Sequence, residues 1–210
     1  MSQLQIALDG QSLITPQAIT TELSSSRTHR HDEQLPVAKG ELAIVMRIAT
    51  QRIEEGGDPA EAVKWLIGAL HDLRRKFEPS IWQELIPIVQ AHPSAKVFQQ
   101  CPFTRWSYEK PRGYSGDASL IDFIYGHPAV DHEVAKCTQL GLDIYEYTRN
   151  APGPVAVRER RDILTRYVDQ LAAEKGEDFE ILTVAAGHLR EADASVALKE
   201  GRIKRWVALD

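Results

Sequence analysis

The chain has 210 residues, of which 43% are hydrophobic and 26% are charged, and its formal net charge is −5. This composition is ordinary for a soluble globular protein and allows one or two buried cores. The negative charge argues against a nucleic-acid surface built on bulk positive charge. No apolar run approaches the roughly 20 residues that span a bilayer, and no signal peptide is visible. We therefore expect a cytoplasmic protein with no membrane span and no nucleic-acid partner.

The first part of the chain is predicted to be helical after a polar arm. Residues 1–38 are polar and show no sustained hydrophobic period, which is typical of a flexible arm. From 39 to 175 the apolar residues recur at helical spacing, which predicts a helical cap domain. Asp58 followed by Pro59 predicts the start of one of these helices, with an N-cap and a proline at the first helical position. The stretch 93–116 is expected to be irregular because it is rich in Pro, Gly and aromatic residues.

The last segment, 176–210, changes to an α/β pattern. Glu180–Glu191 is typical of a buried strand that turns through Gly187 into a helix, and Lys204–Asp210 of a second strand that ends on a carboxylate. This order predicts an α/β fold class: an N-terminal helical domain followed by the β-α-β start of a Rossmann-like sheet. The sequence contains no further strands of such a sheet, so we expect a truncated chain.

The glycine turn and the acid are the first candidate binding feature. A glycine lets the backbone approach a ligand closely, and the helix expected from His188 directs its positive end toward the same place. Asp210 follows Gly187 by about 20 residues, the separation typical of an acid that binds ribose hydroxyls. The alternative is an ordinary β-α-β unit in which Gly187 only turns the chain and Asp210 is solvated. Sequence geometry leaves both open.

The turn does not suit a dinucleotide. Of the three glycines in G-x-G-x-x-G, the segment Ala185–Arg190 keeps one, and Glu191 adds an acid that would repel a pyrophosphate. A ligand with an adenosyl group and no phosphate fits better, and S-adenosylmethionine is the common one. An NAD(P)-dependent enzyme remains an alternative that the missing glycines disfavour.

A second candidate feature is the loop Glu109–Asp117, which contains two glycines and a proline. Arg112, Tyr114 and Asp117 can project from it toward a ligand. The alternatives are that Asp117 caps the following helix and that Arg112 pairs with a nearby acid.

The remaining polar residues suggest no catalytic or metal site. Arg158 and Arg161 lie three residues apart, on one face of a predicted helix, and a solvated basic face with acidic partners is the favoured interpretation. The seven histidines form neither an HExxH motif nor a Cys/His cluster with metal spacing, so we expect no metal. No catalytic residue is identified.

Three segments, in chain order, resemble a group of bacterial class I S-adenosylmethionine-dependent methyltransferases. Some members are described as fatty-acid methyl ester (3-hydroxypalmitate methyl ester type) biosynthesis proteins. Their motifs are a K-P-x-G-Y-A-G-D loop, an A-V-R-N-R-R helix and a motif I turn of the type L-S-L-G-C-G-P-A-R-E. The matching segments are Lys110–Asp117, Ala156–Arg161 and Leu182–Glu191, so the resemblance covers roughly residues 100–210.

The resemblance implies a cofactor, S-adenosyl-L-methionine, and a small-molecule or lipid methyl acceptor. Ala185, in place of the first motif I glycine, would line the methionine and ribose part together with Gly187. Without the strands that supply substrate contacts, the truncated chain would be inactive alone. The cofactor-binding residues expected from the loop, the turn and the resemblance are Arg112, Tyr114, Gly116, Asp117, Ala185, Gly187, His188 and Asp210.

A rival hypothesis is a complete, non-enzymatic interaction module. In it the helices form the body, and the short α/β tail pairs with another chain through its open strand edges. A homo-oligomer formed through those edges is one version of this hypothesis.

Overall fold

The computed structural model describes residues 16–176 and 178–210, which form two compact units. One unit ends at Ala95 and the other is Lys96–Asp210. The sequence places its boundary at residue 175, between a helical cap and an α/β segment. The structure instead groups the helices after residue 95 with the strands, because the long helix α9 (Pro152–Lys175) packs against elements on both sides of that boundary.

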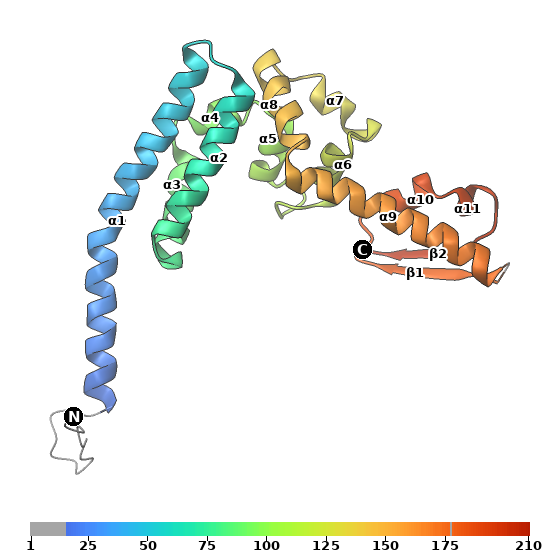
Figure 1. Cartoon of the computed structure of the whole chain (residues 1–210), viewed down its shortest axis with the longest axis horizontal. Coiled ribbons are helices and arrows are strands. Elements are labelled where there is room, and N and C mark those ends of the chain that lie inside the picture. Colours follow the sequence, from blue (N-terminus) through green and yellow to red (C-terminus); the bar gives the residue numbers. More distant parts are fainter. Residues whose placement is uncertain (1–15, 177) are drawn as a thin grey trace, which may run out of the picture. The chain divides into compact units, whose positions relative to one another are not determined.

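The first unit contains three long helices, α1 (Pro16–Glu54), α2 (Pro59–Lys76) and α3 (Pro79–Ala91), and α1 packs against the other two (Figure 1). Helix α2 begins where the sequence predicts, because the Asp58 side chain accepts a hydrogen bond of 2.9 Å from the Ala60 amide. Apolar side chains at helical spacing form the core of this unit: Leu42, Met46, Ala49, Leu66, Leu73, Ile81 and Leu85.

The structure differs from the predicted polar arm (residues 1–38) over residues 16–38. Helix α1 begins at Pro16, so residues 16–38 are helical, and residues 1–15 lie outside the described part of the chain. His31 Nε2 lies 2.8 Å from Glu84 Oε1 of α3, and Ala38 is fully buried. These tertiary contacts stabilise a helix that hydrophobic periodicity does not reveal.

In the second unit, the stretch expected to be irregular also contains helices. Pro102 stands at the first position of α5, and Lys110 ends that helix in a left-handed conformation. The helical elements from residue 95 onward are α4 (Ala95–Phe98), α5 (Pro102–Glu109), α6 (Ala118–Tyr125), η1 (Pro128–Val130), α7 (Asp131–Val134), α8 (Gln139–Arg149), α9, α10 (Arg190–Ala194) and α11 (Val196–Lys199).

A two-stranded parallel sheet follows α9. Strands β1 (Glu180–Val184) and β2 (Arg205–Leu209) lie where the sequence predicts them and pair with Leu182 opposite Val207. The helix predicted between them is interrupted at Ser195, which gives the short helices α10 and α11. Figure 1 shows both strands running along α9. One face of the sheet packs on a small core of α9 and α11, so the chain is a mixed α/β protein with a helical region before the sheet.

None of the helices that the structure describes has the length and the hydropathy needed to cross a membrane.

Candidate functional site

The second unit contains a cavity of about 280 Å³ at the carboxyl ends of the two strands. Its wall is made by the loop that follows β1, from Ala185 to Glu191, and by one side of α6. Tyr114 and Gly116 contribute from the loop before α6, Arg160 from α9, and Asp210 from the end of β2. Segments far apart in the sequence therefore meet around one hollow.

The glycine turn and the acid are adjacent in this wall. The Gly187 N–H donates a hydrogen bond of 2.9 Å to Asp210 Oδ1, and the Ala186 N–H donates one of 3.0 Å to the Leu209 carbonyl. Both bonds continue the pairing of the strands past their ends. The two residues that the sequence singles out as a ligand-binding pair are thus held together, and both line the cavity.

Alternate residues of the loop adopt left-handed backbone conformations. The φ angles are 55° at Ala185, 54° at Gly187 and 48° at Leu189. A residue with a Cβ atom is strained in this region by roughly 1–2 kcal/mol, whereas glycine is not. Ala185 therefore occupies a position whose backbone conformation favours glycine.

Gly187 packs closely against the start of α6. A Cβ atom built at Gly187 would lie 3.3 Å from the Cβ of Ala118, which is closer than most real contacts between such atoms. The loop and the helix can approach this closely because both residues are small.

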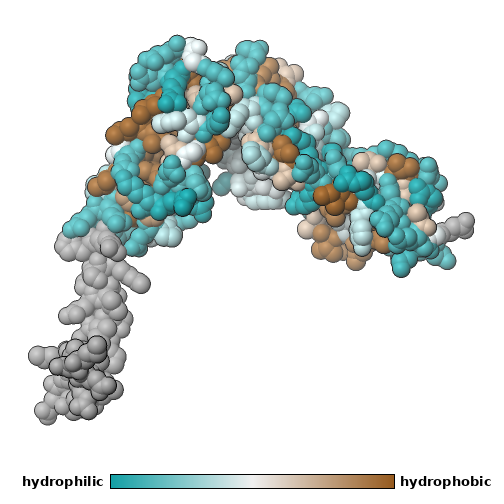
Figure 2. All heavy atoms as spheres, viewed as in Figure 1, coloured by the Kyte–Doolittle hydropathy of each residue, from teal (hydrophilic) through white to brown (hydrophobic). Residues whose placement is uncertain are grey.

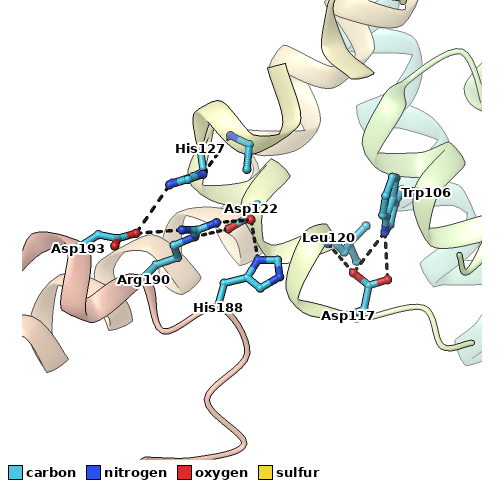
Figure 3. A network of polar contacts seen from close by, with 9 residues as sticks. Trp106, Asp117, Leu120, Asp122, His127, His188, Arg190 and Asp193 are labelled. Carbon is cyan, nitrogen blue, oxygen red and sulfur yellow. Dashed lines mark hydrogen bonds and ion pairs between the residues drawn. The ribbon is translucent and has the colours of Figure 1, made fainter. Parts of the chain in front are cut away.

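A buried acid joins α6 to the loop (Figure 3). The Asp122 side chain is 1% exposed. The Arg190 guanidinium donates from Nε to Oδ1 and from an Nη atom to Oδ2, each at 2.8 Å, and His188 Nδ1 lies 2.7 Å from Oδ2. Burial alone would raise the pKa of Asp122, but hydrogen bonds from Arg190 and His188 outweigh it and lower the pKa. The buried carboxyl group is therefore ionised at neutral pH.

The cluster extends outward to η1. Arg190 also donates to Asp193 Oδ2 at 3.0 Å, and His127 Nε2 lies 3.7 Å from the same oxygen. The hydrogen bond to Asp122 raises the pKa of Arg190, and the bond to Asp193 adds to this effect. Together they outweigh burial, which alone would lower the pKa. The Ala129 N–H donates to His127 Nδ1, so neutral His127 carries its proton on Nε2.

The structure brings together six of the eight residues predicted to bind the cofactor: Tyr114, Gly116, Ala185, Gly187, His188 and Asp210 all line the cavity. The other two, Arg112 and Asp117, do not. Arg112 is exposed. Asp117 is fully buried and caps α6 by accepting from the Leu120 amide at 2.9 Å, and it also accepts from the Trp106 indole at 3.0 Å (Figure 3). For Asp117 the capping alternative is the observed arrangement.

The basic helix α9 is less solvated than the sequence suggests. Arg158 donates to the carbonyl of Ile124 at 3.2 Å and to the carbonyl of Arg149, so it ties the ends of α6 and α8 together. Arg161 pairs with Asp162 at 2.7 Å, as expected, and its guanidinium carbon also lies 4.7 Å from the centre of the Tyr125 ring.

Several residues of the cavity wall were missed by sequence reasoning: Asp122, Tyr125, Arg160, Arg190 and Glu191. One signal was available for Asp122, since it is a lone acid in the otherwise apolar run Leu120–Ile124. An acid at such a position is either partnered or functional. Among the residues that the structure describes, no group of three or more His, Cys, Asp and Glu could hold a metal ion.

The charges left around the cavity favour a particular kind of ligand. Arg190 and Asp122 neutralise each other, which leaves the acids Glu191 and Asp210 and the cation Arg160 in the wall. Such a set suits a ligand with both positive and negative groups.

Comparison with protein-family models, with curated proteins and with solved structures finds no match to this chain.

Proposed function

We propose that the chain binds S-adenosylmethionine in this cavity and provides the cofactor site of a methyltransferase that acts on a small-molecule or lipid acceptor. The observation that carries the proposal is the 2.9 Å bond from the Gly187 amide to Asp210 in the wall of a cavity of about 280 Å³. The loop residues Ala185 and Gly187 would face the methionine and ribose part, and Asp210 would bind the ribose hydroxyls.

Charge supports this ligand over a dinucleotide. S-adenosylmethionine carries a sulfonium, an ammonium and a carboxylate, which complement the acids Glu191 and Asp210 and the cation Arg160. A pyrophosphate would meet Glu191 instead. Helix α10, which begins at Arg190, has five residues, so its dipole contributes little toward an anion. The cavity volume of about 280 Å³ is also just below the roughly 300–1,000 Å³ of ligand pockets, which favours the smaller ligand.

The backbone of the turn suits a ligand that has no phosphate groups. The Gly187 N–H is already bonded to Asp210, so the turn offers a close backbone surface more than free donors for phosphate oxygens. When bound, the cofactor supplies an activated methyl group, and the protein supplies binding and orientation. The resemblance of the loop and turn motifs to class I methyltransferases supports the same assignment.

Calorimetric titration with S-adenosylhomocysteine tests the proposal. The wild-type chain should give a saturable heat, and Asp210→Asn should weaken the affinity about tenfold or more, as expected when a charge-assisted hydrogen bond is lost. Asp178→Asn is the matched control, because Asp178 is an exposed acid that pairs with Lys204 and does not line the cavity. A folded wild-type chain that gives no heat rejects the proposal. A saturable fluorescence change with NADH and no heat with S-adenosylhomocysteine would point to an NAD(P)-dependent enzyme.

A second candidate function, pairing with another chain, is favoured by the free face of the sheet. Leu182, Val184 and Leu209 are 63%, 71% and 52% exposed, and the register places all three on the face opposite α9. Figure 2 shows hydrophobic surface near the carboxyl ends of β1 and β2. Parallel sheets are normally covered on both faces, so an apolar face of this kind is suited to a partner.

Analytical ultracentrifugation tests this second candidate. The wild-type chain should associate as its concentration rises, and the double variant Leu182→Thr, Val184→Thr should reduce the association. Ile67→Thr is the control, since Ile67 is a similarly exposed apolar residue on α2. A wild-type chain that stays monomeric at all concentrations removes self-pairing as a function.

A further inference from the structure

We propose that His188 is the proton acceptor of the cavity, that Asp122 is its positioning residue, and that the methyl acceptor is a hydroxyl group. This inference rests on the proposed function and adds the chemistry of the acceptor to it. The geometry that carries it is an imidazole whose Nδ1 faces a buried carboxylate while the ring lines the ligand cavity (Figure 3).

The carboxylate fixes which ring nitrogen holds the proton. An ionised carboxylate can only accept hydrogen bonds, so the 2.7 Å contact between Asp122 Oδ2 and His188 Nδ1 requires a proton on Nδ1. Neutral His188 then keeps the lone pair on Nε2. Arg190 contacts both oxygens of Asp122, so the carboxylate is held in one orientation and cannot rotate away from the ring.

Two other histidines, His92 and His127, are arranged in the opposite sense. His92 Nδ1 accepts from the Ser94 amide at 3.2 Å, and His127 Nδ1 accepts from the Ala129 amide at 3.1 Å. Both rings therefore carry the proton on Nε2 when they are neutral. His188 differs from them because its Nδ1 partner is a buried acid.

The ring remains accessible from the cavity. The His188 side chain is 34% exposed, whereas that of Asp122 is 1% exposed. Nε2 of His188 makes no hydrogen bond to residues 31–176 or 178–210. The ionisable groups that share the cavity wall with His188 come from five segments: Tyr114 of the loop before α6, Asp122 and Tyr125 of α6, Arg160 of α9, Arg190 and Glu191 of α10, and Asp210 after β2.

The chemistry of a placed base distinguishes a hydroxyl acceptor from a carboxylate. Methylation of a hydroxyl forms an O–C bond, breaks the C–S bond with its electron pair left on sulfur, and releases the hydroxyl proton. Nε2 of His188 takes that proton, and the resulting imidazolium keeps its Nδ1–H on Asp122. A carboxylic acid is already ionised at neutral pH and has no proton to lose, so it needs no such base. Between a hydroxyl and a carboxylate, a placed base therefore favours the hydroxyl as the acceptor.

Nitrogen-15 NMR of the full labelled chain tests the assignment of the proton without any turnover. In the neutral state His188 should show the Nδ1–H tautomer, while His92 and His127 in the same spectrum show Nε2–H. In Asp122→Asn, His188 should lose its Nδ1–H preference. If that variant does not fold, the wild-type spectrum alone decides. A wild-type His188 with its proton on Nε2 overturns the inference.

Acylation with diethyl pyrocarbonate tests whether Nε2 is reachable from the ligand site. His188 should be modified, and saturating S-adenosylhomocysteine should protect it. His132, whose side chain is 66% exposed and does not line the cavity, should react equally with and without the ligand. An unreactive His188, or a His188 that bound S-adenosylhomocysteine leaves unprotected, overturns the inference.

The two proposals fail in different ways. Calorimetric binding of S-adenosylhomocysteine together with an Nε2–H tautomer rejects the role of His188 and leaves the cofactor assignment standing. No binding, with the Nδ1–H tautomer present, rejects the cofactor assignment and with it the methyl-transfer role of His188.

Discussion

At the scale of single residues, the loop after β1 is defined by its backbone conformation. Ala185 and Gly187 have almost the same φ angle, although only glycine adopts it without strain. Strained residues of this kind persist where the surrounding structure holds them, and they are frequent at ligand sites. Here the strand pairing that continues to Ala186 and Gly187 provides the constraint.

We predict that Ala185→Gly stabilises the protein. Relief of the left-handed strain exceeds the entropy that glycine adds to the unfolded chain, so the free energy of unfolding should rise by about 0.5–1 kcal/mol. Urea denaturation measures it. Ala186→Gly is the control, because the φ of Ala186 is not positive, and it should lower stability by about 0.5–1 kcal/mol. Equal losses in both variants would contradict the strain at Ala185.

At the scale of elements, helix α6 links three features: its N-cap Asp117, the buried acid Asp122 and the wall of the cavity. Its first residue touches Gly187, its middle provides Asp122, and its N-cap Asp117 satisfies both a helix amide and the Trp106 indole. Substitution of Asp117 or Asp122 should therefore affect the wall of the site as well as helix α6.

We predict that Asp117→Ala lowers the free energy of unfolding by about 2–3 kcal/mol. The substitution removes the helix cap and leaves the Leu120 and Trp106 N–H groups without their acceptor in a buried place. Chemical denaturation followed by circular dichroism measures the change. Asp131→Ala is the comparison, since exposed Asp131 in the first turn of α7 should change stability by no more than about 0.5 kcal/mol. A loss at Asp117 as small as that would mean the cap contributes little.

Asp122 should make stability depend on acid pH. Its folded-state pKa is lowered below the ordinary 3.8, because the bonds from Arg190 and His188 outweigh burial. The stabilisation that ionised Asp122 contributes to the folded state is therefore fully present above about pH 4, and it is lost as the pH falls through the folded-state pKa. The free energy of unfolding should fall less steeply below pH 4 in Asp122→Asn than in the wild type. The variant itself should be about 3 kcal/mol less stable at pH 7. Parallel pH curves for the two proteins would exclude this linkage.

The sequence predicts local features well and contacts between distant residues poorly. The caps at Asp58 and Asp117 follow from the residues just after them, and the two strands follow from short apolar runs around a glycine turn. By contrast, Asp122 meets His188 and Arg190 across 66 and 68 residues of sequence, and no local pattern encodes such a contact. The grouping of the helices after residue 95 with the strands has no local signal either, since it depends on what α9 packs against.

At the scale of the whole molecule, the cavity belongs to one unit. Each residue of its wall lies within Lys96–Asp210, whereas fully buried Ile81 lies in the first unit. A change at Ile81 should therefore act on stability without acting directly on the ligand site.

We predict that Ile81→Ala destabilises the first unit by about 2–5 kcal/mol and leaves the affinity for S-adenosylhomocysteine unchanged. Ile144→Ala is the matched substitution in the second unit, where Ile144 is equally buried, and it should weaken binding as that unit loses stability. Thermal denaturation and calorimetry on the same samples measure both effects. Loss of binding in Ile81→Ala, with the second unit still folded, would show that the site depends on the first unit.

The close approach of Gly187 to Ala118 has a consequence for evolution. A bulkier side chain at either position would push the loop off the helix and open the wall of the site. Descendants of this gene that keep the cavity are therefore constrained to small residues at both positions together. We therefore expect a small residue at both positions, rather than a glycine-rich consensus, to mark the orthologues that keep this cavity.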